Sequence, residues 1–144
     1  MSVLEKELVV SDLNFDFNKK DAVTDLTKEF GQQFSISKSV REQHTDTTTI
    51  HTSKLPDGVV FAENEIDVKK TVEICQKYKC PIIPFGVGSS LEGHVNALYG
   101  GISIDLNNMN KILHVSPEDG YAVVQPGVTR EQLNVYLRDT GLFF

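Results

Sequence analysis

Cysteine is scarce in this sequence, since the 144 residues include only Cys75 and Cys80. Four residues separate them, which differs from the CxxC pair of zinc sites and redox motifs, and no second pair of ligands follows. A disulfide framework of the kind that stabilises small secreted domains is disfavoured for the same reason. We therefore predict that both thiols are structural and pack as small hydrophobic groups.

Long apolar runs are missing as well. No stretch of the sequence approaches the roughly 20 apolar residues that are needed to span a bilayer. Residues 1–7 carry acidic side chains where a signal peptide has a basic region followed by an apolar run. We therefore expect a cytoplasmic protein without a transmembrane segment, and peripheral attachment to a membrane stays open as an alternative.

Basic side chains are outnumbered, with 14 Lys and Arg against 20 Asp and Glu and a formal net charge of −6. Nucleic-acid binding depends on a basic surface that releases counterions from phosphates, so no nucleic-acid partner is expected. The remaining composition, 40% hydrophobic and 24% charged, is that of an ordinary globular protein. The length corresponds to one domain, given that domains usually have about 100–200 residues.

The N-terminal region is polar and helix-like over residues 1–36. Val23, Leu26 and Phe30 recur at spacings of three and four, which predicts a helix within residues 20–34. Gly31 follows the last of these apolar positions and offers a stop signal for that helix.

Residues 37–58 show no apolar period and end in a strong turn signal, Leu-Pro-Asp-Gly. This segment is either a linker or an ordered loop over a ligand, and the residues alone leave both interpretations open. We divide the chain into an N-terminal helical segment, residues 1–40, and a second domain, residues 41–144.

A strand, a helix and a second strand are predicted between residues 59 and 85. Residues 59–62 and 81–85 are short apolar runs of the buried-strand type. Between them Asn64 is a good helix N-cap, and the helix is expected to reach Lys79. A strand-helix-strand unit predicts a locally parallel sheet. The apolar face of the helix consists of Val68, Val72, Ile74, Cys75 and Tyr78.

The last third of the chain predicts further strands and a helix. Residues 101–106 alternate like a half-buried strand, while 112–115 and 121–125 predict a hairpin with a five-residue loop. Thr129 begins a capping box with the glutamine three positions later, and Gly141 fits the position after that helix. The fold class is therefore α+β: a βαβ unit, a mixed sheet and a hairpin, preceded by a helical segment.

Residues 84–93, Pro-Phe-Gly-Val-Gly-Ser-Ser-Leu-Glu-Gly, form the stretch that carries chemistry, directly after a predicted strand. Glycines let successive backbone N–H groups converge on an anion, and serine hydroxyls add donors. The dinucleotide fingerprint fails at Leu91, where it requires glycine, and the Walker A pattern fails at His94 and Val95. The residues favour a phosphate or pyrophosphate loop, with a glycine-rich surface loop as the alternative.

This run resembles the pyrophosphate loop of the vanillyl-alcohol-oxidase-like (PCMH-type) family of FAD-binding domains. Residues 56–62 resemble the first strand of that family, and residues 125–128 resemble the segment after its hairpin. The sequence Ser-Leu-Glu-Gly-His at 90–94 is similar to the D-lactate dehydrogenase (cytochrome) and glycolate oxidase FAD-subunit branch. The resemblance covers about residues 41–144 and implies the N-terminal portion of a PCMH-type FAD-binding domain.

The resemblance implies FAD as the cofactor and D-2-hydroxy acid oxidation as the activity. The substrate would be of the D-lactate or glycolate type, its product a 2-oxo acid, and the electron acceptor a carrier such as a cytochrome or a quinone. A non-catalytic nucleotide- or anion-binding module and another flavoenzyme of the same fold stay open as alternatives. The implied cofactor-binding residues are Pro84, Phe85, Gly86, Val87, Gly88, Ser89, Ser90 and Gly127.

No catalytic residue and no metal ligand are assigned. Family members continue beyond the segment that corresponds to Phe144, so we expect this chain to be a truncated N-terminal part without the catalytic groups. His94 ends the loop and either contacts the cofactor or is structural, while His44 and His51 do not make a metal site by their spacing. His114 is expected to be a partly buried strand residue.

Overall fold

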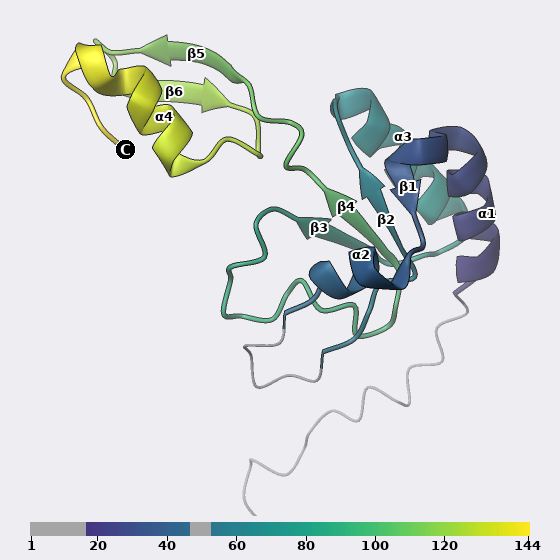
Figure 1. Cartoon of the computed structure of the whole chain (residues 1–144). Coiled ribbons are helices and arrows are strands. Elements are labelled where there is room, and N and C mark those ends of the chain that lie inside the picture. Colours follow the sequence, from purple (N-terminus) through teal and green to yellow (C-terminus); the bar gives the residue numbers. More distant parts are fainter. Residues whose placement is uncertain (1–16, 47–52) are drawn as a thin grey trace, which may run out of the picture.

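The computed structural model describes residues 17–46 and 53–144 and centres on a four-stranded sheet in the order β1-β2-β4-β3 (Figure 1). β2, β4 and β3 are parallel, and β1 pairs antiparallel with β2. The parallel strands confirm the sheet that the strand-helix-strand pattern predicts, although β4 lies between β2 and β3. The bounds are β1 Phe34–Ser35, β2 Gly58–Phe61, β3 Ile82–Phe85 and β4 Ile102–Asp105.

Three helices accompany this sheet: α1 Lys19–Phe30, α2 Lys38–Gln43 and α3 Glu65–Lys77. α1 ends before Gly31, as its spacing predicts. The expectation that residues 37–58 lack regular structure is wrong for α2, because six residues are too few to show an apolar period. Residues 47–52 of that segment lie outside the described part of the chain.

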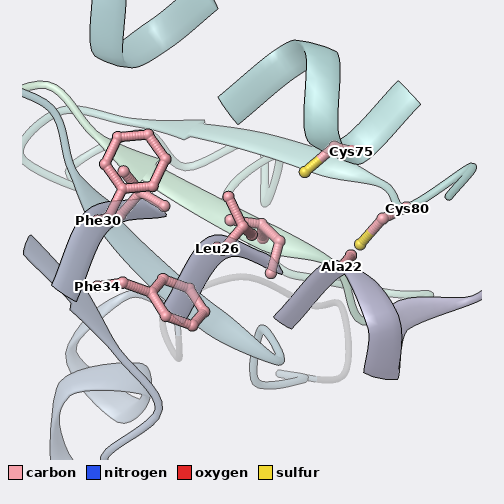
Figure 2. Close-up of a cluster of buried hydrophobic side chains, with 8 residues drawn as sticks. Ala22, Leu26, Phe30, Phe34, Cys75 and Cys80 are labelled. Carbon is pink, nitrogen blue, oxygen red and sulfur yellow. The ribbon is translucent and has the colours of Figure 1, made fainter. Parts of the chain in front are cut away.

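α1 and α3 pack together on one face of the sheet and form the main core with it (Figure 2). Leu26 of α1 and Val60 of β2 are fully buried there. Burying a side chain of this size stabilises the fold by about 1.5–3 kcal/mol, so α1 is held by the same core as the sheet. The buried members of the cluster are Ala22, Leu26, Phe30, Phe34, Val60, Cys75, Cys80 and Ile102.

β4 is buried along its whole length, which corrects the expectation of a half-buried strand. It is an inner strand of the sheet, and all four of its residues, on both faces, are buried. Ile102 belongs to the core under α1 and α3, whereas Asp105 contacts His44 at the end of α2 on the opposite face. The alternation of polar and apolar residues in β4 therefore reflects two buried faces, one apolar and one polar. It does not reflect one buried face and one face that is exposed to water.

α3 begins at the predicted N-cap, where Asn64 Oδ1 accepts hydrogen bonds from the backbone N–H groups of Ile66 and Asp67. Its predicted buried face needs one correction, because Val72 is 41% exposed and Thr71 is buried in its place. The Thr71 hydroxyl donates to the Asp67 carbonyl one turn earlier. That bond satisfies the hydroxyl within the helix and lets a polar residue occupy a core position.

Both cysteines are free and buried, in agreement with a structural role (Figure 2). The pKa of the Cys75 thiol is raised by its hydrogen bond with Cys80 and by burial. A thiol that stays protonated is a poor nucleophile and a poor metal ligand. Because both residues are buried members of the main core cluster, they act as small core side chains.

The predicted hairpin is β5 Ile112–Ser116 with β6 Tyr121–Val124, followed by α4 Arg130–Leu137. Its loop is one residue shorter than expected, since Ser116 pairs with Tyr121. His114 is exposed on β5 beside the ring of Tyr121, so the expectation that it is partly buried is wrong. Figure 1 shows the hairpin and α4 packed together beyond the end of the sheet.

α4 begins as its capping box predicts, with Thr129 Oγ1 accepting from the backbone N–H of Gln132 at 3.1 Å. The Gln132 amide does not reach back to the cap and donates instead to the Asn110 carbonyl. Gly141 takes a left-handed conformation after the final turn, at the position predicted for it. Within residues 17–46 and 53–144, no helix combines the length and the apolar character that crossing a membrane requires.

Candidate functional site

The carboxyl ends of the three parallel strands meet at one edge of the sheet. Phe61 of β2 and Phe85 of β3 both pair in register with Asp105 of β4, so the three side chains project from the same face. Ligands of open α/β sheets bind outside this kind of edge. The glycine-rich loop, residues 86–93, leaves β3 at the same edge.

The loop requires glycine at position 88. Gly88 has a φ of 67°, in the left-handed region, and a Cβ atom there would lie 2.8 Å from Cζ of Phe85. Gly86 differs, because a Cβ atom at that position would meet nothing within 4 Å. The loop is thus forced to turn at Gly88 and is open at Gly86, where a ligand can approach the backbone.

Five successive backbone N–H groups, at residues 86–90, donate no hydrogen bond to any acceptor in the described part of the chain. The first interaction after them is a bond from the Glu92 N–H to Ser90 Oγ. Unpaired backbone donors of this kind are satisfied by water or by a ligand. A run of them around a left-handed glycine forms a concave surface that suits an anion.

A cavity of about 380 Å³ lies beside this loop. It brings Gly86 and Val87 together with Gly127, three of the residues that the sequence singles out. Asn107 and Arg130 also line the cavity, and neither was predicted from the sequence. The available signal was the position of Asn107 directly after the carboxyl end of β4. The lining residues are Gly86, Val87, Asn107, Pro126, Gly127, Val128, Thr129 and Arg130.

The remaining predicted residues take different positions around the loop. Pro84 is exposed on β3, while Phe85 is buried beneath the loop. Ser89 is exposed, and Ser90 is half-buried. Glu92 is exposed as well, and its carboxylate makes no hydrogen bond with the described residues.

Gly127 lines the cavity, but close backbone packing, and not the cavity, explains why glycine is needed at this position. A Cβ atom there would lie 2.5 Å from the Leu106 carbonyl oxygen and 2.7 Å from that of Asn107. Its N–H donates to the Met109 carbonyl at 2.8 Å. The chain segments at 106–109 and 125–127 therefore pack backbone against backbone.

His44 occupies the same edge of the sheet from the end of α2. It is only 4% exposed, and its ring lies 4.4 Å from that of Phe85 and 5.7 Å from that of Phe61, between ring centres. Nε2 lies 2.9 Å from Oδ2 of Asp105, and Nδ1 lies 2.7 Å from the Val40 carbonyl oxygen. Nothing in the local sequence of His44 indicated this site.

Both ring nitrogens of His44 face acceptors, which favours the doubly protonated imidazolium. Burial disfavours that charge, but the hydrogen bonds to Asp105 and Val40 outweigh it and raise the pKa of His44 above its usual 6.5. Burial raises the pKa of Asp105, but the hydrogen bonds from His44 and Asn107 outweigh this effect and lower the pKa below 3.8. The two residues form a buried ion pair.

Asp105 uses its second oxygen to hold Asn107. Oδ1 accepts from the backbone N–H and from Nδ2 of Asn107, both at 2.8 Å. The same Nδ2 donates to the Gly86 carbonyl at 2.8 Å. A continuous hydrogen-bonded path therefore leads from α2 through the end of β4 to the first residue of the glycine loop.

The other histidines do not join this network. His94 is exposed in the loop that follows the glycine-rich run. His51 lies outside the described residues. In the two ranges that the structure covers, no group of three or more His, Cys, Asp or Glu side chains is arranged to hold a metal ion.

Residues 56–144 match the model of a protein family described as an FAD binding domain. A probable mitochondrial D-lactate dehydrogenase of Danio rerio is 46% identical over 76% of this chain and 22% of its own length. The mitochondrial D-lactate dehydrogenase [cytochrome] of Kluyveromyces lactis is 34% identical over 99% of the chain and 29% of its own length. The chain thus spans less than a third of either relative.

The fold is also found among solved flavoprotein structures. The structure of p-cresol methylhydroxylase with bound substrate superposes on 85% of this chain with a TM-score of 0.68 and 25% identity. The match covers 25% of that protein. The α+β arrangement predicted from the sequence is therefore the PCMH-type arrangement.

Proposed function

Because the chain belongs to the FAD-binding domain family, with FAD as its cofactor, we propose that its glycine loop holds the FAD pyrophosphate of a D-2-hydroxy acid dehydrogenase. The observation that carries the proposal is the row of backbone N–H groups at residues 86–90, which have no acceptor among the described residues. They lie at the carboxyl edge of a parallel sheet, beside a cavity, where such sheets bind ligands.

The residues at this edge fit a pyrophosphate. Backbone amides and the hydroxyls of Ser89 and Ser90 supply directed donors, and a group that is held without being hydrolysed needs no lysine. Arg130 adds positive charge to the cavity wall, at the N-terminus of the eight-residue helix α4. The open space at Gly86 lets the phosphate oxygens reach the backbone.

The chemistry that bound FAD supplies is acceptance of a hydride from the carbon that carries the substrate hydroxyl. This chain binds and orients the cofactor: residues 84–90 and Gly127 hold its pyrophosphate end. We propose D-lactate as the substrate, because both relatives are named D-lactate dehydrogenases. Glycolate is the second substrate class to test, and a cytochrome is the proposed electron acceptor, with a quinone as the other carrier.

We also propose a mitochondrial location in place of the cytoplasmic one expected from the sequence, because both relatives are named as mitochondrial proteins. Fractionation of cells that express a tagged chain tests this location. Recovery of the chain in the soluble cytoplasmic fraction contradicts it.

Flavin titration of the purified chain tests the binding proposal. We expect FAD to bind with a dissociation constant on the order of 0.1 mM, since one end of a ligand contributes only part of the total affinity. Riboflavin, which lacks the pyrophosphate, is expected to bind at least about tenfold more weakly.

Two results contradict the proposal in different ways. Equal affinity for FAD and riboflavin shows that the loop does not recognise the pyrophosphate. Inorganic pyrophosphate that binds as tightly as FAD identifies a general anion-binding module.

D-lactate oxidation is then measured with an enzyme that contains this segment together with the rest of a relative, and loss of turnover on Gly88→Ala supports the assignment of the loop.

A further inference from the structure

We propose that His44 is a positioning residue for the pyrophosphate loop and acts through Asp105 and Asn107 to hold the Gly86 carbonyl in one orientation. The inference rests on the proposed function, since it concerns the shape of the same loop. His44 is not among the residues that line the cavity, and its hydrogen bonds go to Val40 and Asp105. Its ring also packs against Phe85 beneath the loop, and the proposal concerns the second route, the hydrogen-bonded path through Asp105.

The orientation of the Gly86 carbonyl fixes the direction of the next backbone N–H group in the loop, that of Val87. A trans peptide is planar, with its C=O and N–H groups directed to opposite sides. The bond from Asn107 Nδ2 to the Gly86 carbonyl, at 2.8 Å, therefore also sets the direction of the Val87 N–H. The Val87 N–H is one of the loop donors without an acceptor among the described residues, and a Cβ atom at Gly86 would meet nothing within 4 Å.

Asn107 is in turn held by Asp105. Its backbone N–H and its side-chain amide both donate to Oδ1 of that carboxylate. With one Nδ2 hydrogen on Asp105 and the other on Gly86, the amide has no donor left and its orientation is determined. Any shift of the Asp105 carboxylate therefore moves the amide that holds the loop.

His44 keeps that carboxylate in place. Oδ2 of Asp105 is paired with Nε2 of His44 at 2.9 Å, which leaves Oδ1 to Asn107. The histidine ring is itself confined between Phe61 and Phe85 and anchored to the Val40 carbonyl. Without His44 the buried carboxylate lacks a charged partner, and it is expected to turn toward other donors.

Protonation of His44 is part of the arrangement. The strands packed against the ring present Phe61 from β2, Phe85 from β3 and Asp105 from β4, and among these Asp105 alone carries charge. A neutral imidazole has one N–H and must give up its bond to either Val40 or Asp105. Deprotonation of His44 should therefore change the orientation of the Gly86 carbonyl in the loop.

The first test uses the free chain and needs no flavin. Nuclear magnetic resonance of the ¹⁵N-labelled protein follows the His44 ring protons and the Val87 amide from pH 6 to pH 9. We expect the Val87 amide shift to titrate with the same midpoint as His44. Asn107→Ala should abolish this response, while the control Asn108→Ala, an exposed neighbour of the same type, should retain it.

The result that overturns the inference is a Val87 amide that ignores the titration of His44 or follows it equally in Asn107→Ala. A purely structural role for His44 would affect stability without this residue-specific pH response. Asn107 is half-buried at a turn, so its truncation leaves the core in place and the test does not depend on a variant that fails to fold.

The second test is FAD titration at pH 6. Asn107→Ala and His44→Gln should weaken binding about tenfold, the factor expected when one hydrogen bond of the path is lost. Asn108→Ala and His114→Gln, both exposed positions, should bind as the parent chain does. Unchanged affinity of Asn107→Ala contradicts the inference, whereas a parent chain that binds no FAD contradicts the proposed function and leaves the amide response to decide the inference.

Discussion

A Cβ atom on Gly127 would lie 2.5 Å from the carbonyl oxygen of Leu106, a separation that real structures essentially never show. This contact gives Gly127 a structural reason for being glycine, independent of any ligand. Gly86, which lines the same cavity, has open space where a side chain would go. The two glycines of the cavity can therefore be separated by experiment.

Gly127→Ala should lower the free energy of unfolding by about 2–4 kcal/mol, because backbone atoms must shift to admit the methyl group. Gly86→Ala should change stability by no more than about 0.5 kcal/mol and weaken FAD binding. Urea unfolding followed by circular dichroism and flavin titration measure the two effects. A stable Gly127→Ala variant, or a Gly86→Ala variant with full affinity, contradicts this division of roles.

Gly88→Ala should lower both stability and affinity. The left-handed φ of 67° costs an alanine about 1–2 kcal/mol, and the methyl group would also press on the Phe85 ring. Gly120→Ala is the matched control, since Gly120 has a φ of 69° with nothing nearby and lies in the hairpin turn. We expect both variants to lose stability in urea unfolding and only Gly88→Ala to lose FAD affinity.

The His44–Asp105 pair should make stability depend on pH. Since the folded-state pKa of His44 lies above 6.5, its contribution is complete below pH 6.5 and disappears as the pH rises through the raised value. The lowered pKa of Asp105 makes its contribution complete above pH 3.8 and lost as the pH falls through the lowered value. The pair therefore stabilises the fold most between pH 3.8 and 6.5.

Urea unfolding at pH 6 and pH 9 measures the alkaline side of this dependence. The parent chain should lose stability between the two values, and His44→Gln should lose much less. His114→Gln should behave as the parent does, because His114 is exposed and contacts only the Tyr121 ring among the interactions described. If the parent and His44→Gln lose the same unfolding free energy between pH 6 and pH 9, His44 is not a buried, charged residue.

Leu26→Ala should destabilise the sheet as well as α1, by about 2–5 kcal/mol. Leu26 is fully buried in a core that includes Val60 of β2 and Cys75 of α3. Leu113→Ala, at a position that is 59% exposed, is the control and should cost little. Division of the chain at residue 40 stays a proposal. Because Leu26 and Val60 share one core, we expect α1 and the sheet to unfold in a single thermal transition, and a separate transition for α1 contradicts the shared core.

Local patterns explain which parts of the fold were predictable. Apolar spacing, N-caps and turn residues act within a few positions of the chain, and they were sufficient for α1, α3, the hairpin and α4. α2 was missed because six residues carry no period. The burial of β4 was underestimated because the order of strands, which makes it an inner strand, is not a local property.

The candidate site shows the same limit. The glycine-rich run could be recognised from its residues, because the need for unobstructed backbone amides is a property of those residues themselves. The support beneath it could not, since His44 and Asp105 are 61 positions apart and His44 has no motif around it.

By itself, the sequence determined the loop, the strands and helices around it, and the resemblance to a family of FAD-binding domains. The tertiary structure alone decided that His44, Asp105 and Asn107 form one path to Gly86. The physical reason is that the register of parallel β2, β4 and β3 brings their carboxyl ends to one level. α2 then places an imidazole at that edge, where a buried carboxylate needs a partner.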